Sequence, residues 1–83
     1  MKIFYFAWLR ERLNRSEDDL TPPPEVQTAA DLLAWLAKQD DALGLALEKP
    51  AQFKVSRDAR IIPHDGSIVG ASTVAILPPM TGG

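Results

Sequence analysis

Apolar segments at both ends of the chain restrict its fold more than any other feature. Residues 2–8 (Lys-Ile-Phe-Tyr-Phe-Ala-Trp) are mostly aromatic or β-branched and are apolar on both alternating faces, which is typical of a central strand. Thr73–Leu77 is a second β-branched run. Strand pairing should stop at Leu77, because Pro78 and Pro79 have no N–H group to donate. We therefore predict that both ends of the chain contribute strands to one sheet.

Between these strands the sequence predicts one long helix and several short elements. The helix should run from Thr28 to Gln39, since Thr28 is a good N-cap and apolar residues recur on one face. The other expected elements are a short helix or turn over 9–14, a strand over 19–21, a proline loop over 22–24, an ambiguous helical or extended segment over 42–47, and a hairpin of 52–56 with 61–62. This order predicts an α+β fold in which one main helix crosses a mixed sheet, the β-grasp arrangement, with the first and last strands side by side at its centre.

Composition limits the class of protein. The 83 residues, of which 46% are hydrophobic, suit one domain, and we expect a β-grasp domain over 1–79 with a flexible C-terminal Gly-Gly tail over 80–83. A net charge of −2 provides no basic field for nucleic acid. The N-terminal apolar run is too short to span a membrane, and the absence of cysteine excludes thiolate metal sites. We expect a cytoplasmic protein with no metal, nucleic-acid or membrane partner.

Few side chains are candidates for catalysis. His64 is the only histidine and lies beside Asp65, but a lone histidine in a turn is normally solvated, and no activated nucleophile accompanies it. The carboxylate runs at 17–19 and 40–41 are typical of solvated faces. Trp35 projects away from the apolar side of its helix, so it either packs on a neighbouring loop or belongs to a contact surface.

The last four residues, Met80-Thr81-Gly82-Gly83, are the strongest candidate for chemistry. From Pro79 to Gly83 the chain can reach roughly 17 Å at about 3.4 Å per residue, which is enough to enter the active site of another protein. Because glycine has no Cβ, Gly82 and Gly83 allow close approach to the terminal carboxylate. The Gly83 carboxylate is therefore the predicted reactive group, presented by the three residues before it. The alternative is that these residues are only a frayed end.

Alternation along the two terminal strands predicts a second functional surface. We expect the helix to cover the face that carries Ile3, Tyr5, Val74 and Ile76. The opposite face would then carry Phe4, Phe6, Ala75 and Leu77. A sheet covered on one side is normally polar on the other, so these four residues, with Pro78 and Pro79, are predicted to contact a partner protein. The alternatives are a register shifted by one residue or a loop that covers the face.

The chain resembles the small subunit of molybdopterin synthase, a ubiquitin-like sulfur carrier, over essentially its whole length. The resemblance rests on Phe6-Ala7 followed by Leu9-Arg10-Glu11, on the capped helix at Thr28, and on the ending Val-Ala-Ile-Leu-Pro-Pro-Met-Thr-Gly-Gly at 74–83. The aliphatic-Pro-Pro-x-Thr/Ser-Gly-Gly ending is its most specific part. Two loops depart from the family: Pro22–Pro24 is unusual, and residues 70–73 replace an acidic turn.

The resemblance implies a ubiquitin-like β-grasp domain that is not an enzyme by itself and binds no cofactor. An adenylyltransferase similar to ubiquitin-activating enzymes would use ATP and Mg to adenylate Gly83, and a sulfur donor would convert the acyl-adenylate to a thiocarboxylate. The large synthase subunit would hold cyclic pyranopterin monophosphate, which receives the sulfur and becomes the molybdopterin dithiolene. The family also implies a heterotetramer of two small and two large subunits.

Three other functions fit the same sequence. A carrier of the thiamine pathway also ends in Gly-Gly and would use the same activation. A ubiquitin-like modifier would instead join Gly83 to a lysine of a target protein through an amide bond. A non-covalent β-grasp adaptor would not need the tail at all.

Overall fold

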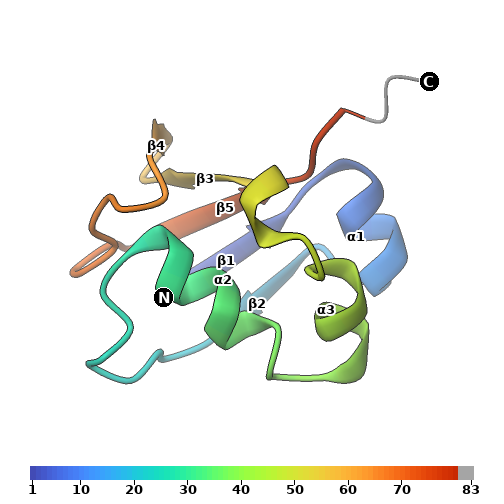
Figure 1. The fold of residues 1–83 in the computed structure, drawn as a ribbon, viewed down its shortest axis with the longest axis horizontal. Coiled ribbons are helices and arrows are strands. Elements are labelled where there is room, and N and C mark those ends of the chain that lie inside the picture. Colours follow the sequence, from blue (N-terminus) through green and yellow to red (C-terminus); the bar gives the residue numbers. More distant parts are fainter. Residues whose placement is uncertain (81–83) are drawn as a thin grey trace.

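A computed structural model describes residues 1–80 of the chain. Five strands form one mixed sheet in the order β2-β1-β5-β3-β4, and β1 (Lys2–Tyr5) runs parallel to β5 (Thr73–Leu77) at its centre. β2 (Glu17–Asp19) pairs antiparallel with β1, β3 (Lys54–Arg57) pairs antiparallel with β5, and β4 (Arg60–Ile62) pairs antiparallel with β3. This is the α+β, β-grasp arrangement predicted from the sequence (Figure 1).

Helices lie over one face of this sheet (Figure 1). They are α1 (Ala7–Leu13), α2 (Ala29–Leu36) and α3 (Asp41–Ala46), followed by the short 3₁₀ helix η1 (Pro50–Gln52). The ambiguous segment at 42–47 is therefore mostly helical. No helix within residues 1–80 is long and apolar enough to cross a membrane.

The main helix begins where the sequence predicts and ends earlier. The Thr28 hydroxyl accepts the Asp31 N–H at 3.1 Å, and the Asp31 carboxylate accepts the Thr28 N–H at 3.2 Å, which is a capping box. Backbone N–H groups of Gln27 and then Thr28 hold the pKa of Asp31 below its usual value. The predicted extension to Gln39 is wrong, because Asp40 caps α3 through the Leu43 N–H at 2.8 Å and the chain must turn before it.

The first strand is shorter than predicted, and this difference matters for the site. Pairing ends at Tyr5 instead of Trp8, because Ala7 adopts a positive φ of 52° and turns the chain directly into α1. The turn lets Leu9 and Leu13 of α1 enter the core, where both are buried. Burial of these two leucines has overridden the strand preference of the aromatic residues before them.

Two of the carboxylates expected on solvated faces take part in a polar network. The buried Tyr5 hydroxyl donates to Asp18 at 2.7 Å, and Arg15 donates to Asp18 and to Asp40, both at 2.9 Å. Burial, followed by the hydrogen bond to Asp18, raises the pKa of Tyr5. The network joins β1, β2 and the start of α3, and it places the second strand at 17–19 rather than 19–21.

The predicted helix-facing side chains form the core. Ile3, Tyr5, Val74 and Ile76 are each at most 1% exposed. They pack with the buried leucines of the helices and with Phe53 and Ile68. Trp35 is half-buried and packs against this core, whereas the packing alternative for that residue predicted a neighbouring loop as its contact. Residues 22–24 form a loop, as expected.

The β3–β4 turn contains an avoidable strain. Its two central residues, Asp58 and Ala59, have φ values of 46° and 72°, which is the geometry of a type I′ hairpin turn. Asp58 tolerates this region and is held there by the Thr73 N–H at 3.0 Å. Ala59 has a Cβ that disfavours it by about 1–2 kcal/mol.

We predict that Ala59→Gly stabilises the domain. Relief of the positive φ should outweigh the greater chain entropy of glycine, giving a net gain of about 0.5–1 kcal/mol and a Tm higher by a few degrees. Thermal unfolding followed by circular dichroism measures the change. Ala34→Gly is the matched control, because Ala34 is an exposed residue in the interior of α2, and it should lower stability by about 1 kcal/mol. A lower Tm for Ala59→Gly contradicts the turn geometry.

Candidate functional site

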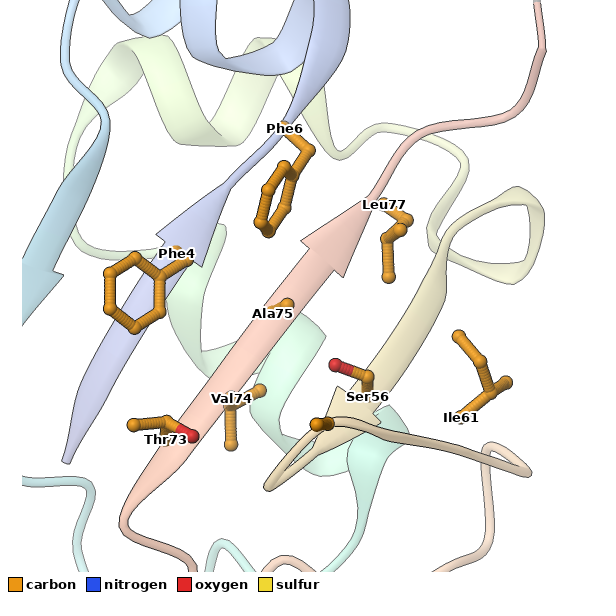
Figure 2. A pocket seen from close by; sticks show the side chains of 9 residues that line it. Phe4, Phe6, Ser56, Ile61, Thr73, Val74, Ala75 and Leu77 are labelled. Carbon is orange, nitrogen blue, oxygen red and sulfur yellow. The ribbon is translucent and has the colours of Figure 1, made fainter.

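The sheet face opposite the helices carries a shallow hollow of about 370 Å³. We call it the apolar groove and define it by the side chains of Phe4, Phe6, Ile61, Ala75 and Leu77. Figure 2 shows Phe4 and Phe6 along one side of Ala75, with Leu77 at the end of β5 and Ile61 on the far side. The groove therefore crosses four elements of the fold.

Strand register explains why these residues share one face. Phe4 is the partner of Ala75, Ala75 is the partner of Ser56, and Ser56 is the partner of Ile61. Residues opposite one another on paired strands point to the same side of a sheet. The four side chains consequently form a row across β1, β5, β3 and β4.

The predicted division of the sheet into two faces is confirmed. Phe4, Ala75 and Leu77 are half-buried, and Phe6 is 46% exposed, so the predicted register is correct. No segment of residues 1–80 fills the groove. Sequence analysis missed Ile61, which is 58% exposed, and Ser56. Ser56 was predicted in the alternating strand 52–56 and Ile61 in the strand 61–62 that pairs with it, but these patterns do not reveal which strand lies next to β5.

Charged residues surround this apolar centre. Lys2 and Glu17 lie on the groove face of β1 and β2, and their side chains form an ion pair at 3.9 Å. Lys54 is the register partner of Leu77 at the opposite end. An apolar centre with a charged rim is the usual anatomy of a protein-binding surface.

The chain leaves the sheet at the end of the groove. Leu77 is the last paired residue of β5, and Pro78 and Pro79 after it are half-buried. The indole N–H of Trp8 donates to the Pro79 carbonyl oxygen at 3.1 Å, a contact that sequence analysis missed. Met80 is 94% exposed. Thr81, Gly82 and Gly83 lie outside the described residues, so their roles stay predictions.

His64 has a structural contact in this fold. Its Nε2–H donates to the Phe53 carbonyl oxygen at 2.7 Å, which ties the loop after β4 to the residue before β3. Asp65 makes no recorded hydrogen bond or ion pair within residues 1–80, so it does not orient the imidazole. In the same part of the chain, no group of three or more His, Cys, Asp or Glu residues is arranged to hold a metal ion.

Comparison with known proteins identifies the family. A family model described as the ThiS family matches residues 3–83. The chain belongs to the ThiS family. A molybdopterin synthase sulfur carrier subunit from Haemophilus influenzae is 28% identical to this ThiS-family chain over 83 residues, which are 100% of this chain and 99% of that protein.

Solved structures share the fold of this ThiS-family chain. SAMP1 from Haloferax volcanii superposes with a TM-score of 0.73 at 21% identity, covering 100% of this chain and 98% of that one. A protein described as molybdopterin converting factor, subunit 1, from Pyrococcus furiosus superposes with a TM-score of 0.69 at 20% identity, covering 95% of each chain. At these identities the likeness establishes the ubiquitin-like β-grasp architecture.

We predict that Phe6→Ser leaves the isolated domain folded. Phe6 is partly solvated and is the N-cap residue of α1, a position that favours serine, so the Tm should change by no more than about 3 °C. Ile76→Ser, on the other face of the sheet and fully buried, should cost about 3 kcal/mol or more. Urea unfolding at neutral pH compares the two. Similar losses of stability in both variants contradict the assignment of faces.

Proposed function

We propose that this chain is a sulfur carrier whose Gly83 carboxylate is converted to a thiocarboxylate, and that it serves molybdopterin synthase as its small subunit. The observation that best supports this proposal is the position of Leu77. It lines the apolar groove, it is the last residue of the central strand β5, and the sequence Pro-Pro-Met-Thr-Gly-Gly follows it directly. The family match extends to residue 83. The Haemophilus influenzae relative, which is named as this subunit, aligns with the whole chain.

The proposed chemistry begins with activation of a poor electrophile. In the activating enzyme a Gly83 carboxylate oxygen attacks the α-phosphorus of ATP, forming a P–O bond while pyrophosphate leaves, and Mg²⁺ neutralises the phosphate charge. Hydrosulfide, or a donor of equivalent sulfur, then attacks the acyl carbon. A C–S bond forms, the C–O bond to AMP breaks, and one proton is released. The product is a thiocarboxylate, which is a soft nucleophile.

Sulfur delivery would take place in the large synthase subunit. The apolar groove would bind that subunit, and the tail from Met80 to Gly83 would reach cyclic pyranopterin monophosphate in its active site. A dithiolene contains two sulfur atoms, so two loaded carriers are needed for each pterin. We assign the acid–base and phosphate-binding groups to the large subunit, and the assembly to a cytoplasmic heterotetramer of two small and two large subunits.

We predict that the chain acquires sulfur at Gly83. Incubation with an adenylyltransferase of the ubiquitin-activating type, MgATP and sulfide should raise the intact mass by the exchange of one oxygen for one sulfur. A variant without Gly83 should remain unmodified while keeping the same Tm, because the buried core residues of the described part of the chain all lie between Ile3 and Ile76. Intact-mass spectrometry reads both.

Other outcomes of this experiment identify the alternatives. Conjugates to lysines of other proteins would indicate a ubiquitin-like modifier, and an unmodified chain would indicate an adaptor. A loaded chain that supplies sulfur to thiazole formation but not to the pterin would indicate a thiamine-pathway carrier.

We predict that the groove carries the binding energy for the large subunit. Phe6→Ser should weaken binding by about tenfold or more, as expected for loss of an aromatic side chain from an interface. Leu45→Ser is the matched control, because Leu45 is 66% exposed but lies on α3, outside the groove, and its affinity should stay within about twofold. Calorimetric titration at fixed ionic strength measures both. Equal weakening by the two substitutions contradicts this use of the groove.

A further inference from the structure

The segment after β5 is held by a side chain, although the sheet cannot hold it. Pro78 and Pro79 have no N–H groups, so the strand ladder ends at Leu77. The Trp8 indole N–H reaches the Pro79 carbonyl oxygen at 3.1 Å across 71 positions of sequence. Within residues 1–80 it is the one recorded hydrogen bond to the segment 78–80. The root of the tail is therefore attached to α1.

The indole is itself fixed by two neighbours. The ring of Trp8 meets the ring of buried Phe53 edge-on, with centroids 5.7 Å apart, and the Arg12 guanidinium lies 4.9 Å from the Trp8 ring centroid. Aromatic and cation–π contacts of this kind restrict the ring to one orientation. The N–H group consequently points at Pro79 before any partner binds.

A strained backbone residue puts Trp8 in this place. The Phe6 N–H donates to the Ile76 carbonyl oxygen at 3.3 Å, so the chain still follows β5 at that point. Ala7 then turns with a φ of 52°, which leaves Phe6 at the groove and Trp8 beside the tail. Positive φ at a residue with a Cβ is unfavourable, and such strain concentrates where a structure must aim a side chain. The turn at Ala7 therefore positions both Phe6 in the apolar groove and Trp8 beside Pro79.

We propose that Trp8 is a positioning residue that holds the tail root at Pro79 and so directs Met80–Gly83 into the active sites of the partner proteins. The inference rests on the proposed sulfur-carrier function and adds a residue to it. Trp8 touches no reacting atom. It acts by fixing the point from which the last four residues extend, which reduces the orientations that must be searched once the groove has docked.

Two substitutions separate the hydrogen bond from the packing of the ring. Trp8→Phe keeps an aromatic ring against Phe53 and Arg12 but removes the N–H donor. Trp8→Gln keeps an N–H donor of similar reach but removes the ring. Trp35→Phe is the matched control, because Trp35 packs on the core and makes no side-chain hydrogen bond to residues 78–80.

The measurement is the rate of thiocarboxylation by the activating enzyme, with MgATP and sulfide, over a range of carrier concentrations. Trp8→Phe should lower kcat about fivefold, the ratio that corresponds to one net hydrogen bond, with little change in KM because the lost contact orients the tail and does not dock the domain. Its Tm should stay close to that of the unchanged protein. Trp8→Gln should show the reverse pattern, with a lower Tm and a kcat near the original value. Trp35→Phe should keep both kinetic constants.

Nuclear magnetic resonance provides a readout that needs no partner. In Trp8→Phe, the ¹⁵N relaxation of the Met80 amide should indicate greater motion than in the unchanged protein, and Trp8→Gln should restore most of the difference. The proposal is overturned if Trp8→Phe has the same kcat as the unchanged protein. It is also overturned if, in both Trp8 variants, the loss of rate is proportional to the loss of Tm. If the unchanged protein takes up no sulfur, the proposed function fails instead. The relaxation of the Met80 amide then tests whether Trp8 holds the tail root, and an equal relaxation in Trp8→Phe and the unchanged protein overturns that part of the proposal.

Discussion

The parallel pairing of β1 with β5 is the constraint on which the rest of the structure depends. Its register sets Tyr5 opposite Ile76 and Phe4 opposite Ala75, so the first pair enters the core and the second lines the apolar groove. A slip of one residue would exchange the faces. The end of β5 has a different cause, because Pro78 has no N–H group and follows Leu77, which pairs with Lys54 of β3. Core and groove are therefore two consequences of one strand pair, and the tail root is a consequence of the prolines.

The ends of elements were predictable where the signal was covalent or local. Pro78 sets the end of β5 and Thr28 sets the start of α2, because a missing N–H group and a capping hydroxyl act on their immediate neighbours. The end of β1 was not predictable in this way. Aromatic residues continue to Trp8, but Ala7 adopts a positive φ so that the leucines of α1 can reach the core, and that requirement exists only in the folded protein.

The residues of the candidate site were likewise predictable only where the signal was local. Alternation within the terminal strands was enough to place Phe4, Phe6 and Leu77 on the uncovered face. The groove positions of Ile61 and Ser56 were not predicted, because a local sequence pattern does not indicate which strand will pair with β5. The hydrogen bond from Trp8 to Pro79 could not be predicted for a similar reason, since it joins positions 71 residues apart. A tryptophan near a sheet end shows only that its N–H needs an acceptor. The sequence does not say which carbonyl provides it.

An exposed apolar groove in a small sheet invites aggregation, and the placement of charge limits this risk. The two edge strands, β2 and β4, are three residues long, and β2 consists of Glu17, Asp18 and Asp19. Short, charged edges resist pairing with another chain. The groove is centred on β5 and reaches an edge strand only through Ile61 of β4, so under the proposed function a partner would dock mainly through side chains on the sheet face. Such docking would leave the strand ladder and the contact between Trp8 and Pro79 intact. The proposed function, in which one chain meets an activating enzyme and then a synthase, would benefit from a binding surface that leaves the strand ladder unpaired with either partner.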